Sequence, residues 1–445
     1  MLSASASASA SASASASASA SAPPSPALPP GLPPELLRRA RQLPKVLLHE
    51  HLDGGLRVAT LLDLMRQRGL VPPAADEAAL ADWFDARAHA GSLDEYLRGF
   101  ALTVAAMATP AALERVAFEA AEDALADGCV LAEFRIAPLL FEAHGVPADV
   151  AVQALLAGLS RSALPSGLIV CAMRHESDAH IARAADLAIA CHRQPPADSA
   201  ADSAADSAAD SAADPPPHPH RHVQPQPYRH AARVVGFDLA GPEAGWPATR
   251  HAALLSRVRA AGLGLTLHAG EADDGIRVLE AARLGAQRIG HGVRLVDLLA
   301  GPGAAQVLAE LAQRHIHLEI CPTSNLHTGA AASLALHPIH ALWRAGLGLS
   351  FHTDNRLMSR IDHSGEAARL VQAGFSWADL VQMGQDAAAA SFLSPTQRDS
   401  ARQALQRWAD RQGLAPSRPA ASAAAAAGPA AANPTTANPS TSNAA

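Results

Sequence analysis

The sequence predicts an α/β protein, a (β/α)8 TIM barrel with extra helices and disordered tails. Eight short apolar runs are mostly separated by longer stretches rich in alanine, leucine and arginine, which is the alternation that such a barrel requires. Several of these runs end in histidine, glutamate or aspartate, and parallel barrels collect their active sites at the carboxyl ends of the strands. The barrel body spans residues 35–415. Without an insert at 195–230, its length of about 345 residues fits one barrel with elaborated loops.

The expected strands follow one another along the chain, with helical patterns between most of them. Two such helical patterns lie at residues 111–126 and 275–284. Because helices join the consecutive strands, we expect the strands to run parallel and to form one barrel. The eight expected strands are residues 45–51, 130–136, 168–173, 234–239, 263–268, 288–291, 317–321 and 347–353.

Three segments have a composition that predicts disorder. Residues 1–34 are Ser-Ala repeats followed by a proline-rich stretch, residues 195–230 hold Ala-Ala-Asp-Ser repeats and a Pro/His tract, and residues 416–445 are alanine, proline, threonine and asparagine. Such segments bury too little apolar surface to offset the entropy lost on folding. The insert falls between the third barrel helix and the fourth strand, so we expect it at the end of the barrel opposite the active site.

Composition argues against several classes of function. With 35 basic and 42 acidic side chains the formal charge is −7, so a nucleic-acid polymer is not an expected partner. No stretch is long and apolar enough to span a membrane, and the Ser-Ala start of the chain is a poor secretory signal. The four cysteines show no CxxC spacing, and three of them lie in or beside apolar runs, which favours buried reduced thiols. We therefore expect a cytoplasmic protein.

The first candidate site residues are His49 and His51, at the end of the first strand-like run. Side chains two positions apart on a strand point to the same face, so both imidazoles are expected to face inward while Glu50 faces the other side. The same spacing occurs at His315 and His317, but that pair lies at the start of a strand-like run. The start of a barrel strand is the stability face, so we interpret the second pair as structural or solvated.

Three further strand ends complete a set of residues with metal-binding chemistry. His268 ends one run, and Glu271 follows it in the loop. His291 ends the next run, and Asp354 follows the last one. Three imidazoles with one carboxylate suit Zn²⁺ with an open position for water, although the sequence leaves other divalent metals open. A glutamate that lies beside such an ion without binding it is available for proton transfer. The site then suits the attack of metal-activated water on an electrophilic carbon. The expected ligands are His49, His51, His268 and Asp354.

Six stretches of this sequence together resemble the adenosine deaminase family of metal-dependent hydrolases. They occur in the family's order, and the resemblance covers residues 35–415 apart from the insert. It implies an enzyme of purine metabolism that hydrolyses adenosine and 2′-deoxyadenosine, giving inosine and ammonia from adenosine. The stretches are residues 45–57 (KVLLHEHLDGGLR), 234–243 (VVGFDLAGPE), 268–271 (HAGE), 288–295 (RIGHGVRL), 318–325 (LEICPTSN) and 353–359 (TDNRLMS).

The resemblance also implies how the catalytic residues divide the work. Glu271 would protonate the purine N1 while hydroxide adds to the neighbouring carbon, which turns an aromatic ring into an attackable C=N bond. His291 would orient the water and help to deprotonate it, and Asp354 would do the same from its second oxygen. Ammonia then leaves from the tetrahedral carbon.

Substrate contacts are implied in the same way. Asp53 would accept a hydrogen bond from the ribose 5′-hydroxyl, and His51 would contact the substrate as well as the metal. The backbone at Gly241 would approach the purine edge, which a missing side chain permits. Many family members have a second aspartate where this chain has Asn355, and this asparagine is expected to donate a hydrogen bond to the purine N7.

Two features have readings that stay open. One is an apolar stripe at helical spacing, which is either a lid over the purine or ordinary core packing. The other is His352, two residues before Asp354, which we interpret as a deeper barrel-layer residue although contact with the site stays open. The stripe consists of Leu93, Tyr96, Leu97 and Phe100.

Two other functions compete with adenosine deamination. The first is the same chemistry on another 6-aminopurine nucleoside, and the second is a catalytically silent binding protein that keeps the barrel. Retention of every expected ligand together with Glu271 and His291 argues against the second. The expected partner is a small-molecule purine nucleoside, and the sequence leaves the oligomeric state open.

Overall fold

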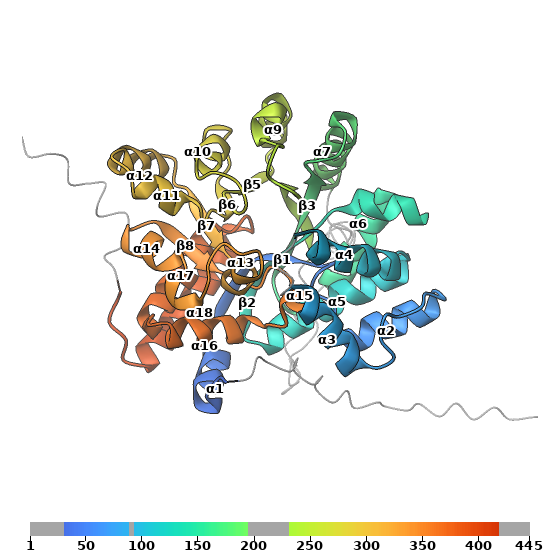
Figure 1. Cartoon of the computed structure of the whole chain (residues 1–445), viewed down its shortest axis with the longest axis horizontal. Helices are drawn as coiled ribbons and strands as arrows, with labels where there is room; N and C mark the ends of the chain where they lie inside the picture. The colour runs from blue at the N-terminus through green and yellow to red at the C-terminus, as the bar shows by residue number, and fades with distance from the viewer. Residues whose placement is uncertain (1–30, 89–92, 195–230, 418–445) are drawn as a thin grey trace, which may run out of the picture.

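The computed structural model describes residues 31–88, 93–194 and 231–417. Its eight strands are all parallel and pair in the order β1 to β8, with the helices arranged around them (Figure 1). The ring closes where the chain beyond β8 meets β1, because His51 N donates to Asp354 O at 2.8 Å and Asp354 N donates to His49 O at 3.0 Å. The predicted (β/α)8 barrel is therefore confirmed.

The strands lie within two residues of the predicted ranges. The last strand was expected to run to residue 353 but ends at Phe351, since the next three residues turn across towards β1. Strands of four to eight residues with almost every position buried are typical of parallel sheets covered on both faces. They are β1 Lys45–His51, β2 Cys129–Ile136, β3 Ser166–Met173, β4 Arg233–Ala240, β5 Gly264–Ala269, β6 Arg288–His291, β7 His317–Ile320 and β8 Gly348–Phe351.

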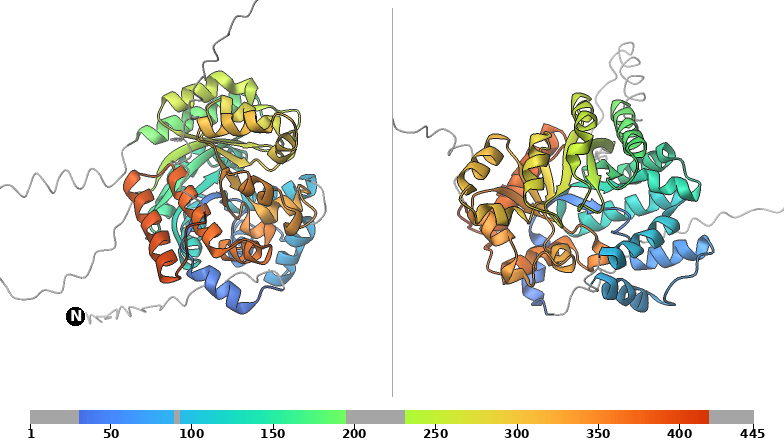
Figure 2. Two further views of the ribbon diagram at one scale, coloured as in Figure 1. Left: turned by 90° about the vertical axis from the view of Figure 1, so that its left-hand side faces the viewer. Right: turned by 45° about the horizontal axis from the view of Figure 1, so that its top comes forward.

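Helices cover the outside of the ring, and further helices lie within the loops that follow the carboxyl ends of the strands (Figures 1 and 2). They are α1 Pro34–Gln42, α2 Val58–Gln67, α3 Glu77–Ala88, α4 Leu93–Met107, α5 Pro110–Ala126, α6 Ala148–Ser160, α7 Asp178–Arg193, α9 Ala252–Ala260, α10 Ile276–Arg283, α11 Leu295–Leu299, α12 Ala304–Gln313, α13 Pro322–His327, α14 Ile339–Arg344, α15 Arg356–Ser359, α16 His363–Gln372, α17 Trp377–Ala390 and α18 Pro395–Arg411. Short 3₁₀ helices are η1 Pro138–His144, η3 Ala248–His251 and η4 Leu334–Leu336.

Local sequence explains where helices begin and how they turn into strands. Thr109 caps α5 by accepting a hydrogen bond from Ala112 N, and Ser376 forms a capping box with Asp379 at the start of α17. Gly128 leads from α5 into β2 with a φ of +88°, where a Cβ would lie 2.6 Å from a backbone oxygen. These features favour one boundary for each element.

Inside the ring, charged side chains form a chain that we call the ion ladder. Arg288 pairs with Glu133 at 2.7 Å and with Glu319 at 2.6 Å. Arg135 pairs with Glu319 at 2.7 Å and with Asp238 at 2.8 Å. All five side chains have 0% exposure, so each charge depends on its neighbours for compensation. The ion ladder runs through β2, β4, β6 and β7, and it therefore ties strands from both halves of the barrel together.

The chain's last helices close one side of the ring. Helix α17 packs against β8 and β1, and α18 packs against α17 and β2. Helix α1 packs against α16 and reaches this pair through Arg39, whose guanidinium lies 4.7 Å from the Trp377 ring centre. Burial between these helices fastens the start of the described chain to its end.

The predicted disordered segments fall almost wholly outside the described residues. Of the predicted tails, only residues 31–34 and 416–417 are described, and the insert at 195–230 lies entirely outside. Its flanking residues belong to the connection between α7 and β4, as expected. Among the described residues no single helix has the length and apolar run to cross a bilayer, whereas two sharply bent helix pairs meet that test by length and composition.

Candidate metal centre and active site

His49 and His51 both point into the site at the end of β1. Their ring centres are 5.4 Å apart, and His49 is fully buried. Glu50, between them, points the other way and accepts hydrogen bonds from Thr353 Oγ1 at 2.8 Å and Arg356 Nε at 2.6 Å. The alternation expected of a strand end is confirmed.

His268 and Asp354 bring two more candidate ligand atoms to the same point. His51 Nε2 lies 3.4 Å from His268 Nε2 and 3.5 Å from Asp354 Oδ1. His49 Nε2 lies 3.3 Å from the same Asp354 oxygen and makes no hydrogen bond within the described residues. Buried nitrogen lone pairs this close to one another and to a carboxylate are stabilised by a cation between them.

Two carboxylates of the ion ladder orient the ligand histidines. Glu319 Oε2 lies 2.9 Å from His49 Nδ1, and Asp238 Oδ2 lies 2.9 Å from His268 Nδ1. With each carboxylate accepting a hydrogen bond from Nδ1–H, the Nε2 atom of each imidazole faces into the site. The ion ladder therefore reaches the site directly.

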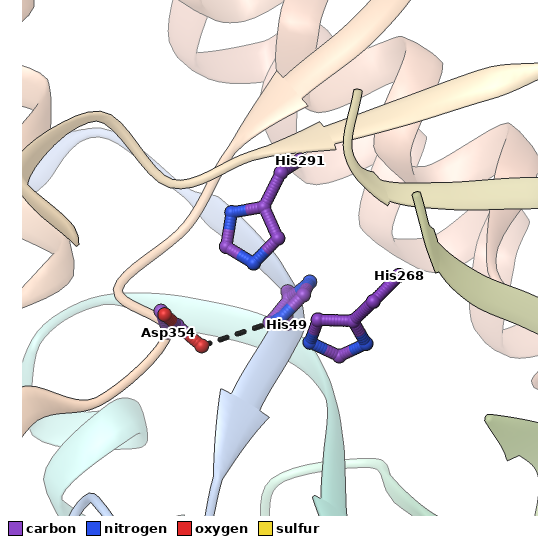
Figure 3. Close-up of side chains that lie close together, drawn as sticks. All are labelled: His49, His268, His291 and Asp354. Carbon is purple, nitrogen blue, oxygen red and sulfur yellow. Dashed lines mark ion pairs between the residues drawn. The ribbon is translucent and has the colours of Figure 1, made fainter. Parts of the chain in front are cut away.

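His291 approaches the same point from the end of β6. His49, His268, His291 and Asp354 each offer one ligand atom, and these atoms all lie within 4.8 Å of one another (Figure 3). His291 Nε2 also lies 3.6 Å from Glu271 Oε2, and its Nδ1 lies 3.1 Å from Asn325 Nδ2. His291 therefore faces both the candidate ligands and the loop glutamate.

The backbone is strained at two of these residues. His291 and Asp354 have φ values of 62° and 59°, a left-handed conformation that costs non-glycine residues energy. Such strain is typical of functional sites in which the surrounding structure holds a side chain in place. Ser324 supplies part of that support, because its hydroxyl donates to Asp354 Oδ2 at 2.7 Å.

Burial sets the charges in the site. It holds the pKa values of His51 and His291 well below the ordinary histidine value, so both imidazoles are neutral and keep a lone pair. Burial would raise the pKa of Asp354, but the facing imidazole of His49 holds it well below its usual range. Burial and then the charge of Asp354 raise the pKa of Glu271 to about 7. The arrangement combines an ionised aspartate with a glutamate poised to carry a proton.

The expected substrate residues surround this centre. Asp53 is 4% exposed, and its Oδ1 has no hydrogen-bond partner among the described residues. Gly241 has a φ of +89°, and a Cβ there would lie 3.1 Å from Met173 Cε and 3.2 Å from His175 Nδ1. Asn355 is buried, and its side chain fills the space that a Cβ on Gly54 would need. The substrate contacts of Asp53, Gly241 and Asn355 stay predictions.

The helix expected to cover the purine is described only in part. Leu93, Tyr96 and Leu97 lie outside the residues whose side chains the structure describes. Phe100 is half-buried and packs against the hydrophobic core. This contact is compatible with core packing and with a lid, so the lid stays a prediction for all four residues.

The remaining histidines have structural surroundings. His352 Nδ1 accepts from Leu48 N at 3.2 Å, and its Nε2 lies 2.7 Å from Ser350 Oγ, so it is occupied in the barrel layer beneath the site. His317 Nε2 meets the same hydroxyl at 2.7 Å. His315 is exposed at the end of α12 with a φ of 53°. The interpretation of His315 and His317 as solvated and structural is confirmed.

Sequence reasoning missed the residues that hold the candidate catalytic side chains. All of them lie inside stretches that carried the family resemblance, but nothing in the spacing told which side chain each one would meet. They are Asp238 and Glu319, which orient histidines, Ser324 and Asn325, which meet Asp354 and His291, and Glu243, which binds the Glu271 loop.

Comparison with known proteins gives a family assignment. The adenosine deaminase family model matches residues 44–224 and 211–408. The adenosine deaminase of Mycobacterium bovis (strain BCG / Pasteur 1173P2) is 41% identical over 379 residues, which cover 81% of this chain and 93% of that protein. The adenosine deaminase of Mycobacterium avium (strain 104) is 40% identical over 378 residues, covering 80% and 92%.

Solved structures share the fold at lower identity. An adenine deaminase from Arthrobacter aurescens superposes with a TM-score of 0.66 at 21% identity, covering 83% of this chain and 99% of that one. An amidohydrolase from Burkholderia ambifaria with bound zinc superposes with a TM-score of 0.65 at 23% identity, covering 87% and 97%. The chain belongs to the adenosine deaminase family, and it is a metal-dependent hydrolase that deaminates adenosine.

Proposed function

We propose that His49, His51, His268 and Asp354 bind one Zn²⁺ ion. The observation that carries the proposal is the spacing of 3.3–3.5 Å between neighbouring ligand atoms of this set. Ligands that bond one Zn²⁺ ion at about 2.0–2.1 Å lie roughly 3–3.5 Å from one another, so the observed spacing fits an ion that would also hold a water. When bound, the metal lowers the pKa of water towards about 7 and so supplies hydroxide at neutral pH.

His51 is a better fourth ligand than His291. His51 Nε2 lies within 3.5 Å of both His268 Nε2 and Asp354 Oδ1. The group of four whose ligand atoms all lie within 4.8 Å of one another includes His291 and leaves out His51, so the choice of His51 rests on these two close contacts. His291 also faces Glu271 at 3.6 Å, which suits a residue that orients water beside the metal ligands. In this role His291 Nε2 holds or takes a water proton, while Asn325 meets the other ring nitrogen.

Glu271 is the proposed proton donor to the purine N1. Burial raises the pKa of this carboxyl to about 7, so a large fraction is protonated at neutral pH and a proton is available for transfer. Its side chain is 21% exposed, which leaves it accessible to a nucleoside. Asp354 keeps its charge and, in our proposal, assists in orienting the water from its second oxygen, which Ser324 also contacts.

Asp53 is proposed to recognise the ribose of the substrate. Its buried Oδ1 has no partner among the described residues, and a ribose 5′-hydroxyl would supply the missing donor. Burial and then the charge of Asp354 raise the pKa of Asp53 to about 7, so this pocket disfavours negative charge and a 5′-phosphate would fit it poorly. Gly241 and Asn355 complete the purine contacts, through the backbone and the N7 hydrogen bond. We therefore propose adenosine and 2′-deoxyadenosine as substrates ahead of AMP.

The test combines metal analysis with a substrate panel. The purified full chain is stripped with a chelator, reloaded with Zn²⁺, Mn²⁺ or Co²⁺, and assayed by the loss of adenosine absorbance. We expect one metal per chain, and faster turnover of adenosine and 2′-deoxyadenosine than of AMP or free adenine. Faster turnover of AMP than of adenosine would refute the reading of Asp53 and favour another 6-aminopurine substrate.

We also propose that residues 35–415 make up the deaminase unit in the cytoplasm. All four cysteines are free and buried, which fits a reducing compartment. Because α1 begins at Pro34, the informative deletion removes residues 1–30, 197–227 and 418–445. We expect deaminase activity to stay within a few-fold of the full chain. A folded deletion variant without activity would show that these segments contribute to the reaction.

A further inference from the structure

One buried carboxylate in the site region binds no ligand candidate and makes no salt bridge within the described residues, although the Arg174 guanidinium lies near enough to interact with its charge. Glu243 follows β4 and is 4% exposed. Its Oε1 accepts from Gly270 N at 2.6 Å, and its Oε2 accepts from the backbone N–H groups of Glu271, Ala272 and Asp273 at 3.0, 3.0 and 3.2 Å. Within the described residues, every side-chain hydrogen bond of Glu243 goes to this one loop.

Four consecutive amides on one carboxylate require an unusual backbone path. Gly270 starts the loop with a φ of +65°, and a Cβ there would lie 2.7 Å from Val278 Cγ2, so glycine alone fits. Successive N–H groups that converge in this way form an anion-binding concavity, and Glu243 fills it from within the protein. The loop is thus shaped around the carboxylate. The local caps of Asp273 and Asp274 bind the amides that follow, at Asp274 and Ile276.

The loop carries the glutamate that the proposed reaction depends on. Glu271 N is one of the four donors, so Glu243 fixes the backbone from which the Glu271 side chain extends to within 3.6 Å of His291. A proton donor must lie within about 2.6–3.2 Å of its acceptor, and a displacement of about 1 Å costs on the order of 10²-fold in rate. The accuracy of this loop is therefore a requirement of the chemistry.

We propose that Glu243 is a positioning residue for the deamination, which sets the place of the Glu271 carboxyl by binding the four amides of residues 270–273. Glu243 touches neither substrate nor metal, since both of its oxygens are already occupied by N–H donors. The inference rests on the proposed role of Glu271 as proton donor. It predicts that a defect at Glu243 acts through Glu271 and leaves the metal in place.

The experiment is a double-mutant cycle in the full chain loaded with Zn²⁺. Glu243→Gln, Glu271→Gln and the double variant are compared for metal content, KM and kcat. We expect Glu243→Gln to lower kcat by about 10- to 100-fold, with KM within threefold and full metal content. In the Glu271→Gln background, the same change should lower kcat by less than threefold, because the residue it positions no longer donates the proton.

Two further variants keep the test decisive. Asp127→Asn removes a carboxylate that accepts from Ser364 N at 2.9 Å, far along the sequence from the site, and should leave kcat unchanged. Glu243→Asp keeps the charge but is too short to reach four amides at once, so it should also lose kcat at constant KM. If Glu243→Gln does not fold, Glu243→Asp carries the same comparison.

The outcomes separate this inference from the proposed function. Wild-type kcat in Glu243→Gln or Glu243→Asp, beside an impaired Glu271→Gln, would overturn the positioning role and leave the proton donor intact. A multiplicative loss in the double variant would overturn it too, because the two residues would then act independently. Wild-type turnover in Glu271→Gln would overturn the proposed proton donor and the inference together.

Discussion

Within the part of the chain that the structure describes, the barrel holds two His-x-His pairs, one at each end of its strands. His49 and His51 end β1, where the Nε2 atoms of both rings lie within 3.5 Å of Asp354 Oδ1 at the proposed metal site. His315 and His317 lie at the start of β7, where one ring is exposed and the other meets the Ser350 hydroxyl. Identical spacing gives two outcomes because the carboxyl ends of parallel strands gather loops, while their starts lead out of helices.

The largest effect is expected from a substitution in the first pair, His49 and His51. Replacing His49 with alanine removes a ligand and leaves Asp354 facing an incomplete set, so we expect bound metal and deaminase activity to disappear together. His315→Ala and His317→Ala should keep one metal per chain and activity within a few-fold. Metal analysis and the absorbance assay on the same preparations decide the matter. Stoichiometric metal in His49→Ala would break the proposed assignment.

The second largest effect is expected at Glu271, where a substitution should impair proton transfer without affecting metal binding at the same end of the barrel. Glu271→Gln keeps the side chain's size but cannot deliver the proton in the same way, so we expect kcat to fall by at least about 10²–10⁴-fold. Metal content and the affinity for a non-reacting purine nucleoside should stay normal. Loss of the metal in this variant would instead make Glu271 a ligand.

A smaller effect is expected where the first pair meets the substrate. Asp53→Ala removes the proposed acceptor of the 5′-hydroxyl, and a desolvated hydroxyl left unpaired costs about 1–3 kcal/mol. The value of kcat/KM for adenosine should fall by about tenfold to a hundredfold or somewhat more. With 5′-deoxyadenosine the same substitution should matter much less. Equal losses on both substrates would contradict the sugar contact.

The second pair should affect stability in acid. Burial lowers the pKa of His317 to about 3 from its ordinary value of 6.5, so the unfolded chain takes up a proton before the folded one does. Stability is therefore full above pH 6.5 and is lost as the pH falls from 6.5 towards 3. At pH 5 the loss from this residue is about 2 kcal/mol.

The variant that tests this is His317→Gln, which keeps a hydrogen-bond partner for Ser350 without titrating. Urea unfolding at pH 7.5 and pH 5 should show a smaller decrease in the variant than in the natural chain, by about 2 kcal/mol. Other buried histidines contribute equally to both proteins and cancel in the difference. Parallel pH dependence would mean that His317 is accessible to protons in the folded state.

The smallest effect belongs to His315. Its φ of 53° is a conformation that glycine adopts without strain. His315→Gly should raise the free energy of unfolding by at most about 1 kcal/mol, because glycine's extra freedom in the unfolded chain offsets part of the relief. The measurement is the thermal midpoint together with kcat, which should not change. A loss of activity would show that this end of the barrel influences the site.

The sequence was sufficient to predict the barrel because each strand can be recognised from the pattern of its own residues. Runs such as residues 263–268 are apolar, short and followed by a chemically distinctive residue, and β5 lies within one residue of that range. The two histidine pairs were also separated correctly, since strand ends and strand starts are visible in the order of residues. The end of β8 was predicted two residues too late, because the turn of the chain towards β1 depends on tertiary contacts.

The supporting residues could not be predicted in the same way. His49 and Glu319 are 270 positions apart, and their contact depends on how two distant strands are staggered across the barrel. The same holds for Asn325 beside His291 and for Ser324 beside Asp354, which come from a short helix after β7. Local patterns fix which way a side chain points, whereas its partner is fixed by register across the ring.

The ion ladder has a consequence for how the enzyme depends on trace metal. Glu319 is held by Arg135 and Arg288 at the same time as it orients His49, so the protein itself fixes this ligand in place. Little of the binding free energy is then spent on ordering side chains. We expect the chelated protein to keep its circular dichroism spectrum and to regain activity on adding zinc without refolding. When the metal is scarce, the protein would therefore stay folded but inactive. The fraction of active enzyme would then follow the concentration of available metal.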